Sequence, residues 1–181
     1  MRMGLAMTGT VAALTLAGTL AGCSDRIDTG APVAGGATAT AMLANASGVA
    51  VGRATATDVA GGLRYTIDVK GMPPGTHGVH VHMTGRCDAP DFTTAGGHWN
   101  PTAMKHGAMN AQGPHEGDLP NLIVGTDGRG TLGVTIPGGT MAALLDADGA
   151  AVVVHAAADD LKTDPSGNSG GRIACGVLTA G

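Results

Sequence analysis

Glycine is the residue that most constrains what this chain can fold into, because 32 of its 181 residues are glycine and nine more are proline. Each glycine inside a helix costs about 1 kcal/mol relative to alanine, so a coiled coil or helical bundle is excluded. Collagen is excluded because no Gly-X-Y period runs through the chain. An apolar fraction of 43% is too high for a disordered chain. What remains is a loop-rich β protein of one domain, with a core of small side chains.

Hydrophobic periodicity predicts strands separated by turns. Apolar and polar residues alternate with a period of two, as in half-buried strands, over 37–46, 49–59 and 63–69. Further strands are expected over 77–83, 121–124, 130–136, 150–155 and 172–178. No segment has a convincing helical pattern. About eight antiparallel strands predict an all-β fold, a Greek-key β-sandwich or barrel with two long functional loops. Between Gly85 and Asp118 the periodicity is lost, and a loop of that length in a compact domain is usually functional.

The N-terminal segment has the composition of an export signal. Arg2 precedes an uncharged stretch that runs from Met3 to Ser24. We therefore expect a signal peptide over residues 1–22; the alternative is a retained transmembrane helix, since about 20 residues can span a bilayer. The end of the stretch, Leu20-Ala21-Gly22-Cys23, resembles the lipobox of bacterial lipoproteins. It predicts a lipidated Cys23, a flexible tether over 23–36 and a folded domain over 37–181. The protein is then an exported cell-envelope lipoprotein that contacts the membrane only through its lipid anchor.

Export bears on the other two cysteines, Cys87 and Cys175. One pair of cysteines in an oxidising compartment is expected to form a disulfide. The alternative is a pair of buried free thiols.

The charge of the chain says little about its partners. Ten basic and fourteen acidic residues give a net charge of −4, and no basic run is present. Nucleic acid is therefore not an expected partner. A small anionic substrate stays open, because a local positive site can exist in a protein of negative net charge.

Histidines are concentrated in one part of the sequence: six of the seven lie between residues 77 and 115. In a strand, His80 and His82 would point to the same face, where two imidazoles can bind one metal ion. Val79 and Val81 would pack on the other face. His77 would point away from His80 and His82, so it is not expected to share their ion.

The aperiodic loop supplies a second group of possible ligands: His98, His106, His115 and Asp118. Three imidazoles and one carboxylate suit a tetrahedral zinc ion, and such an ion would order a loop that has few apolar residues. The alternative is a set of surface histidines in a polar loop. His155 ends a predicted strand, a position that often delivers a site residue.

These residues lie in segments that closely resemble the copper/zinc superoxide dismutases in their bacterial exported form. The resemblance extends from about Ala37 to the C-terminus, and its segments follow one another in the family's order. They are His77-Gly78-Val79-His80-Val81-His82, Ala95-Gly96-Gly97-His98-Trp99-Asn100-Pro101, His106-Gly107, His115-Glu116-Gly117-Asp118-Leu119, Val153-Val154-His155 with Asp159-Asp160-Leu161, and 167–177.

The resemblance implies a role for each matching position. One copper per chain would be bound by His80, His82, His98 and His155, and one zinc by His98, His106, His115 and Asp118. His98 would thus bridge the metals and provide a proton, and Arg172 would hold superoxide beside the copper. Asp159 would link His80 to His106, Cys87 would be bridged to Cys175, and His77 would be structural. The implied activity is dismutation of superoxide to dioxygen and hydrogen peroxide, which protects the cell envelope.

The chain departs from the family pattern in two places. Val79 stands where the family usually has phenylalanine, which should loosen packing behind the copper strand. The segment 162–171 has only Lys162 and Asp164 as charges, so guidance of the substrate by that loop is in doubt; Lys105 is a candidate to compensate. Two other functions stay open at this point: a copper-holding domain of the same fold, and a surface lipoprotein whose metals only order a loop. Monomer and homodimer are both compatible with the sequence.

Overall fold

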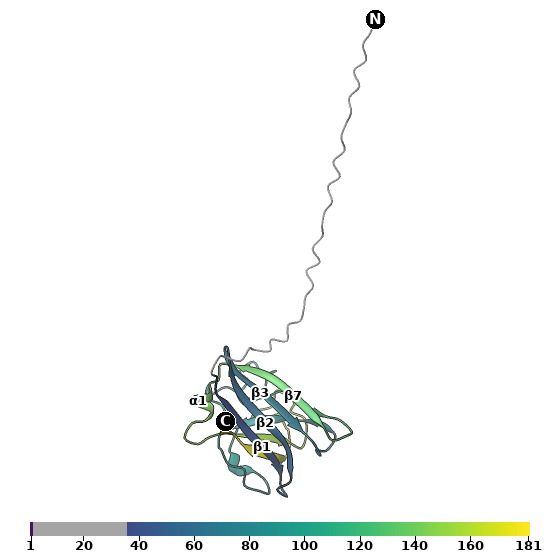
Figure 1. The fold of residues 1–181 in the computed structure, drawn as a ribbon, viewed down its shortest axis with the longest axis vertical. Coiled ribbons are helices and arrows are strands. Elements are labelled where there is room, and N and C mark those ends of the chain that lie inside the picture. The colour runs from purple at the N-terminus through teal and green to yellow at the C-terminus, as the bar shows by residue number, and fades with distance from the viewer. Residues whose placement is uncertain (2–35) are drawn as a thin grey trace.

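The computed structural model describes Met1 and residues 36–181, so the predicted signal peptide and nearly all of the predicted tether lie outside the described residues. The regular secondary structure of the described part is almost entirely β (Figure 1). Its strands are β1 (Thr38–Asn45), β2 (Ala50–Val59), β3 (Gly62–Val69), β4 (Gly75–His77), β5 (Val79–His82), β6 (Leu122–Val124), β7 (Gly130–Pro137), β8 (Ala151–His155), β9 (Arg172–Val177) and β10 (Thr179–Ala180). Within residues 36–181, helical structure is limited to a 3₁₀ turn, η1 (Thr93–Ala95), and one α turn, α1 (Met141–Leu144).

One curled antiparallel sheet forms the body, with strand order β5-β8-β9-β1-β2-β3-β7 and β10 paired to β1. The pairs β1–β2 and β2–β3 are hairpins, whereas β9–β1, β3–β7 and β5–β8 join strands far apart in sequence. These long connections are characteristic of Greek-key folds. The predicted all-β class is confirmed.

The predicted strand over 77–83 is in fact two strands in two sheets. β4 pairs with β6, and β5 pairs with β8. The break falls at Gly78, where a Cβ atom would lie 2.9 Å from the Cβ of Ser169. The chain changes sheets at this close contact, which periodicity alone does not reveal. The sequence predicted about eight strands, whereas the described residues form ten, because this segment contains two strands and because the short β10 was not predicted.

The core follows the predicted alternation and is built from small side chains. Ala39, Ala41 and Leu43 of β1 point inward and are buried. Tyr65 and Trp99 are the two aromatic residues of the main core, and Phe92 belongs to a second cluster beside the disulfide. No helix among residues 36–181 is long and apolar enough to cross a membrane.

The expected disulfide is confirmed: Cys87 is bonded to Cys175, 88 positions later in the chain. It fastens the beginning of the long loop after β5 to strand β9. Because β9 begins at Arg172, the bridge also fixes the loop relative to that residue.

Candidate metal centre

Strand β5 lies at one end of the sheet, and the long loop pairs with its free edge. The amide of Val81 donates to Gly117 O (2.8 Å), and the amide of Trp99 donates to Val81 O (2.8 Å). Gly117 comes so close to the strand that a Cβ atom there would collide with Val81 O. Isolated bridges match His80 with Asp118 and His82 with His98. Backbone pairing thereby brings two candidate ligands of the loop beside two candidate ligands of the strand.

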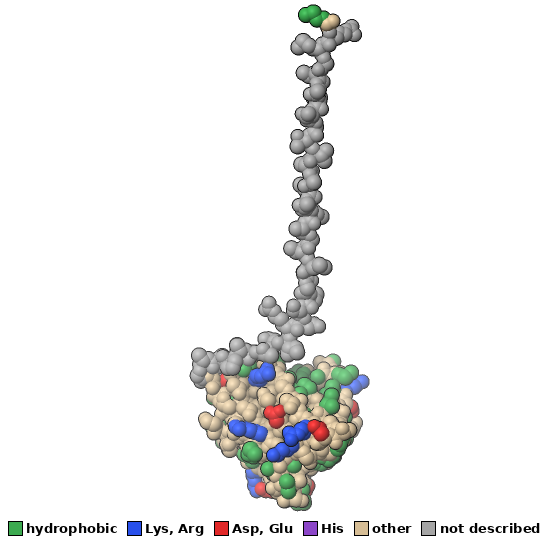
Figure 2. All heavy atoms as spheres, turned by 45° about the vertical axis from the view of Figure 1, so that its right-hand side comes forward, with side chains coloured by type: hydrophobic (Ala, Val, Ile, Leu, Met, Phe, Trp, Pro, Cys, Tyr) green, Lys and Arg blue, Asp and Glu red, His purple; other side chains and the backbone are tan. Residues whose placement is uncertain are grey.

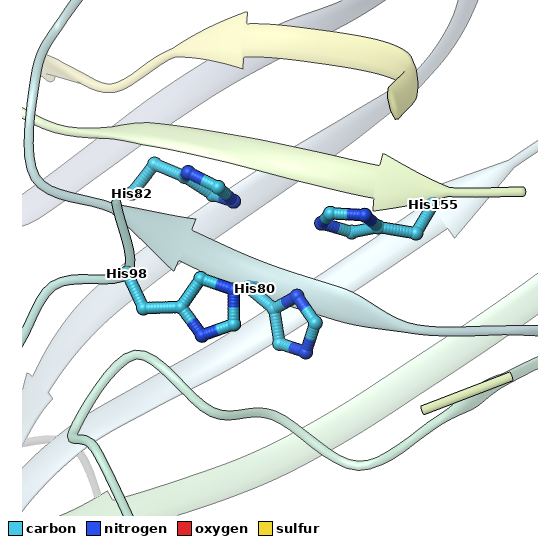
Figure 3. Close-up of side chains that lie close together, drawn as sticks. All are labelled: His80, His82, His98 and His155. Carbon is cyan, nitrogen blue, oxygen red and sulfur yellow. The ribbon is translucent and has the colours of Figure 1, made fainter. Parts of the chain in front are cut away.

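Four buried histidines form the first set of candidate metal ligands (Figure 3): His80, His82, His98 and His155. β5 carries two of them, the end of β8 carries His155, and the loop carries His98. One ligand atom from each lies within 4.8 Å of the others. As predicted from strand parity, His80 and His82 share a face, while Val79 and Val81 pack into the core.

Hydrogen bonds fix which nitrogen of each ring is available. His80 Nε2 donates to Asp159 Oδ2 (2.7 Å), and His82 Nδ1 donates to Gly96 O (2.9 Å). His155 Nδ1 likewise faces a carbonyl oxygen, at 3.2 Å. Because these oxygens only accept, the bonded nitrogens carry the hydrogens and the other nitrogens keep their lone pairs. The nitrogens left buried without a hydrogen-bond partner are His80 Nδ1, His82 Nε2, His98 Nε2 and His155 Nε2.

Burial keeps these imidazoles neutral. It is the main cause that lowers the pKa of His82 to about 2, of His155 to about 3 and of His98 to about 4. Burial also lowers the pKa of His80. Neutral imidazole is the form that binds metals, so this set is ready to coordinate an ion at neutral pH.

The second set is arranged around the carboxylate of Asp118. Its Oδ1 lies 2.8 Å from His98 Nδ1, 3.0 Å from His106 Nδ1 and 3.1 Å from His115 Nδ1. Its Oδ2 accepts from the amides of Gly107 and His115, both at 2.9 Å. Although burial alone would raise the pKa of Asp118, hydrogen bonds from His106 and His98 hold it well below the usual range. His98 therefore presents Nε2 to the first set and Nδ1 to the second.

Asp159 connects the two sets. Its Oδ2 accepts from His80, as described, and its Oδ1 accepts from His106 Nε2 (3.0 Å). Asn121 fixes its backbone through two hydrogen bonds, of 2.8 and 2.9 Å. Although burial would lower the pKa of His106, the Asp118 and Asp159 carboxylates raise it to about 9.

Arg172 borders a hollow of about 420 Å³ beside the first set. His82, His98 and His155 also line this hollow. The guanidinium donates to Phe92 O and to Gly96 O, both at 2.7 Å. Both carbonyls belong to the loop that the disulfide fastens to β9, so the bridge helps to hold this cation in place.

His77 and Lys105 lie outside both sets. The ring nitrogens of His77 face His155 O (2.8 Å) and Pro73 O (2.9 Å), which leaves neither free for a metal. Lys105 Nζ lies 3.2 Å from a carboxylate oxygen of exposed Asp164 and is therefore already paired.

Comparison with known proteins agrees with this geometry. Residues 49–178 match the family model for copper/zinc superoxide dismutase (SODC). The chain belongs to the copper/zinc superoxide dismutase family. Superoxide dismutase (Cu-Zn) 2 of Aquifex aeolicus is 40% identical over 146 residues, which cover 76% of this chain and 84% of that protein. Superoxide dismutase (Cu-Zn) of Caulobacter vibrioides is 41% identical over 147 residues, covering 77% and 84%.

The solved structure of a SOD-like protein from Bacillus subtilis is also similar to this chain, with a TM-score of 0.73 at 41% sequence identity. The match covers 77% of this chain and 97% of that one. The shared barrel supports the fold derived above from strand order and register.

Some residues that shape the site carry no signal in the sequence for that role. They are Phe92 and Gly96, which act through their carbonyl oxygens, and Asn121, which acts through its side chain. A backbone carbonyl is present in every residue, so its use as an acceptor leaves no trace in residue type. Asn121 lies at the predicted start of a strand, and only the tertiary structure places it against Asp159.

Proposed function

We propose that this chain dismutates superoxide to dioxygen and hydrogen peroxide, with one copper and one zinc per chain. The observation that carries the proposal is the set of four buried imidazole nitrogens without hydrogen-bond partners, beside a hollow that Arg172 borders. Buried polar atoms of this kind are costly unless a ligand satisfies them. Imidazole suits copper and zinc, and the mixed histidine and carboxylate set suits zinc.

The assignment of metals follows the donor atoms. Copper would be held by His80, His82, His98 and His155, and zinc by His98, His106, His115 and Asp118, so that His98 serves both. When bound, copper supplies the one-electron oxidation and reduction of successive superoxide ions, whereas zinc has no redox chemistry at such a site.

The chain contributes charge, orientation and a proton. Arg172 is permanently cationic and attracts a small anion into the hollow without titrating itself. His98 Nε2 has no other partner, so in its protonated form it is placed to pass a proton to the reduced product. Asp159 keeps Nε2 of His80 and His106 protonated, which turns Nδ1 of both rings toward the metals.

We further propose that the protein is an exported lipoprotein that protects the cell envelope. The support is the uncharged stretch before Cys23 and its lipobox-like end. Replacing Cys23 by Ala should release the protein from the membrane fraction, and a Cys23→Ala variant that stays membrane-bound would contradict lipidation.

Metal analysis paired with a dismutase assay tests the proposed activity. One copper and one zinc per chain, with superoxide consumption that needs copper, is the expected result. His155→Ala should lose copper and activity but keep zinc. His77→Gln is the matched control, because His77 has no nitrogen free for a metal. Both metals without activity would indicate a copper-holding protein, and zinc alone would indicate a purely structural metal.

A further inference from the structure

The outer surface of β1, β2, β3 and β7 carries side chains that the metal centre does not use. These four strands lie side by side in Figure 1. Register places Met42, Arg53, Asp68 and Thr131 in one row across them. On β3, Arg64 and Asp68 are four positions apart, so their side chains point to the same side of the sheet. Lys70 comes directly after the strand, two positions beyond Asp68.

Four cations gather on or beside this surface: Arg53, Arg64, Lys70 and Arg129. We call the outer surface of the four strands, with these residues, the cationic face. Figure 2 shows Lys and Arg side chains spread over the side of the molecule that is turned forward there. None of the four lies within 4.0 Å of a carboxylate oxygen among the described residues. By contrast, Arg86 and Lys105 elsewhere are both paired with aspartates.

Charge is segregated between this face and the rest of the molecule. The cationic face carries its four cations and two carboxylates, Asp68 and Asp127. The rest of residues 36–181 carries four cations and ten carboxylates. The face is therefore locally positive on a molecule of negative net charge, and it would turn toward an anionic surface while the remainder is repelled.

One end of the face, where β2 begins and β3 ends, is hollowed and partly apolar. A hollow of about 390 Å³ is lined by Met42, Arg53, Asp68, Lys70 and Arg129, among others. Met42 is 65% exposed. Basic side chains around an exposed apolar one are the combination that binds the headgroup region of an anionic bilayer.

We propose that the cationic face docks the barrel on an anionic phospholipid surface. This contact goes beyond the proposed function and does not depend on it or on the lipidation of Cys23. The hollow beside Arg172 shares no lining residue with the hollow on the cationic face. Docking through β1–β3 and β7 therefore does not use the residues that line the candidate metal centre.

Vesicle binding by the full chain tests the proposal. The chain is purified with Cys23→Ala, so that no lipid is attached there. It is then sedimented with vesicles of phosphatidylcholine or with vesicles of phosphatidylcholine and about 30% phosphatidylglycerol, whose anionic headgroups give the surface a negative potential. A lysine or arginine near such a surface contributes about fivefold in partitioning, which corresponds to about 1 kcal/mol. The variant Arg53→Gln, Lys70→Gln, Arg129→Gln should therefore bind anionic vesicles at least about tenfold more weakly.

The matched control changes net charge by the same amount elsewhere: Arg86→Gln, Lys105→Gln, Lys162→Gln. It should bind like the parent, and the parent's preference for anionic vesicles should disappear at about 0.5 M salt, where charge attraction is screened. Any affinity of the N-terminal segment is common to all three proteins and so cancels. The proposal is overturned if the parent has no preference for anionic vesicles, or if both variants weaken equally. It is also overturned if the face variant converts a dimer in solution to a monomer, since a second copy would then cover the face.

Discussion

Replacing Asp159 by Asn should weaken copper binding and leave zinc binding nearly unchanged. Oδ1 of Asp159 accepts from His106 Nε2 and from the amide of Leu161, whereas Oδ2 accepts from His80 Nε2 alone. Asn has one acceptor oxygen, which will take the Oδ1 position, where two donors need it. Its amide group then points an N–H at the N–H of His80.

The size of the effect follows from the bond that is lost. His80 loses a charge-assisted hydrogen bond of 2.7 Å, and such bonds contribute about 1.5–3 kcal/mol. The ring escapes the donor–donor contact only by moving its hydrogen to Nδ1, the atom that faces the first ligand set. Copper affinity should therefore fall by about 10–100-fold, as is typical when the partner of a ligating histidine is removed.

Competition titrations with a chromophoric chelator, run separately for copper and zinc, measure the affinity of each variant for each metal. Asp160→Asn is the matched control: it makes the same change at the next residue, where the exposed carboxylate bonds Thr163 and Asn168 instead of a ligand. Unchanged copper affinity in Asp159→Asn would refute the reasoning. A loss confined to zinc would show that the Asn side chain takes the opposite orientation.

Four other changes have definite expected results. Arg172→Glu should slow superoxide turnover strongly at low salt with copper content unchanged; an unaltered rate would remove Arg172 from the mechanism. Replacing Cys87 and Cys175 by Ser should lower the free energy of unfolding by up to about 4.6 kcal/mol, from the loop-entropy relation, as measured by denaturant titration. Burial, helped by Glu116, raises the pKa of Tyr65, so stability should fall as pH rises above about 10, where the unfolded state loses this proton first. Tyr65→Phe should remove most of this decrease in stability above pH 10. At pH 7 the substitution should leave the free energy of unfolding unchanged or raise it, because the buried hydroxyl has no hydrogen-bond partner; a large decrease at pH 7 would show that the hydroxyl has one. Removing both metals should lower the melting temperature by many degrees in calorimetry, and a negligible shift would contradict a stabilising role.

Strands were predictable from the sequence where one face meets the core and the other meets solvent. β3 is such a strand, since Leu63, Tyr65 and Ile67 are buried and the residues between them are more exposed. The pattern failed at Gly78, because β5 is buried on both faces and its register comes from contacts with distant segments. Residue type there carries no information about which sheet a strand joins.

The candidate ligands could be predicted from the sequence, but the backbone interactions that position them could not. Imidazole and carboxylate are chemically distinctive, so His98 and Asp118 could be singled out in a loop without periodicity. Their positions depend on backbone bonds between the loop and β5, which need a particular residue type only at Gly117, where a Cβ atom would collide with Val81 O. The same limit applies to Arg172, whose two acceptors are carbonyl oxygens.

The loop that carries the candidate ligands contributes little to the hydrophobic core, so other interactions must hold it in place. In residues 85–118 the buried apolar side chains are few, Phe92, Ala95 and Trp99, so burial alone contributes little to holding the loop. Backbone pairing with β5, the disulfide and the carboxylates of Asp118 and Asp159 supply the remaining order. Even so, the loop encloses imidazole nitrogens that no protein group satisfies. Binding free energy at those nitrogens is therefore also folding free energy for the loop, and the same residues that prepare the site for chemistry make its structure depend on being filled.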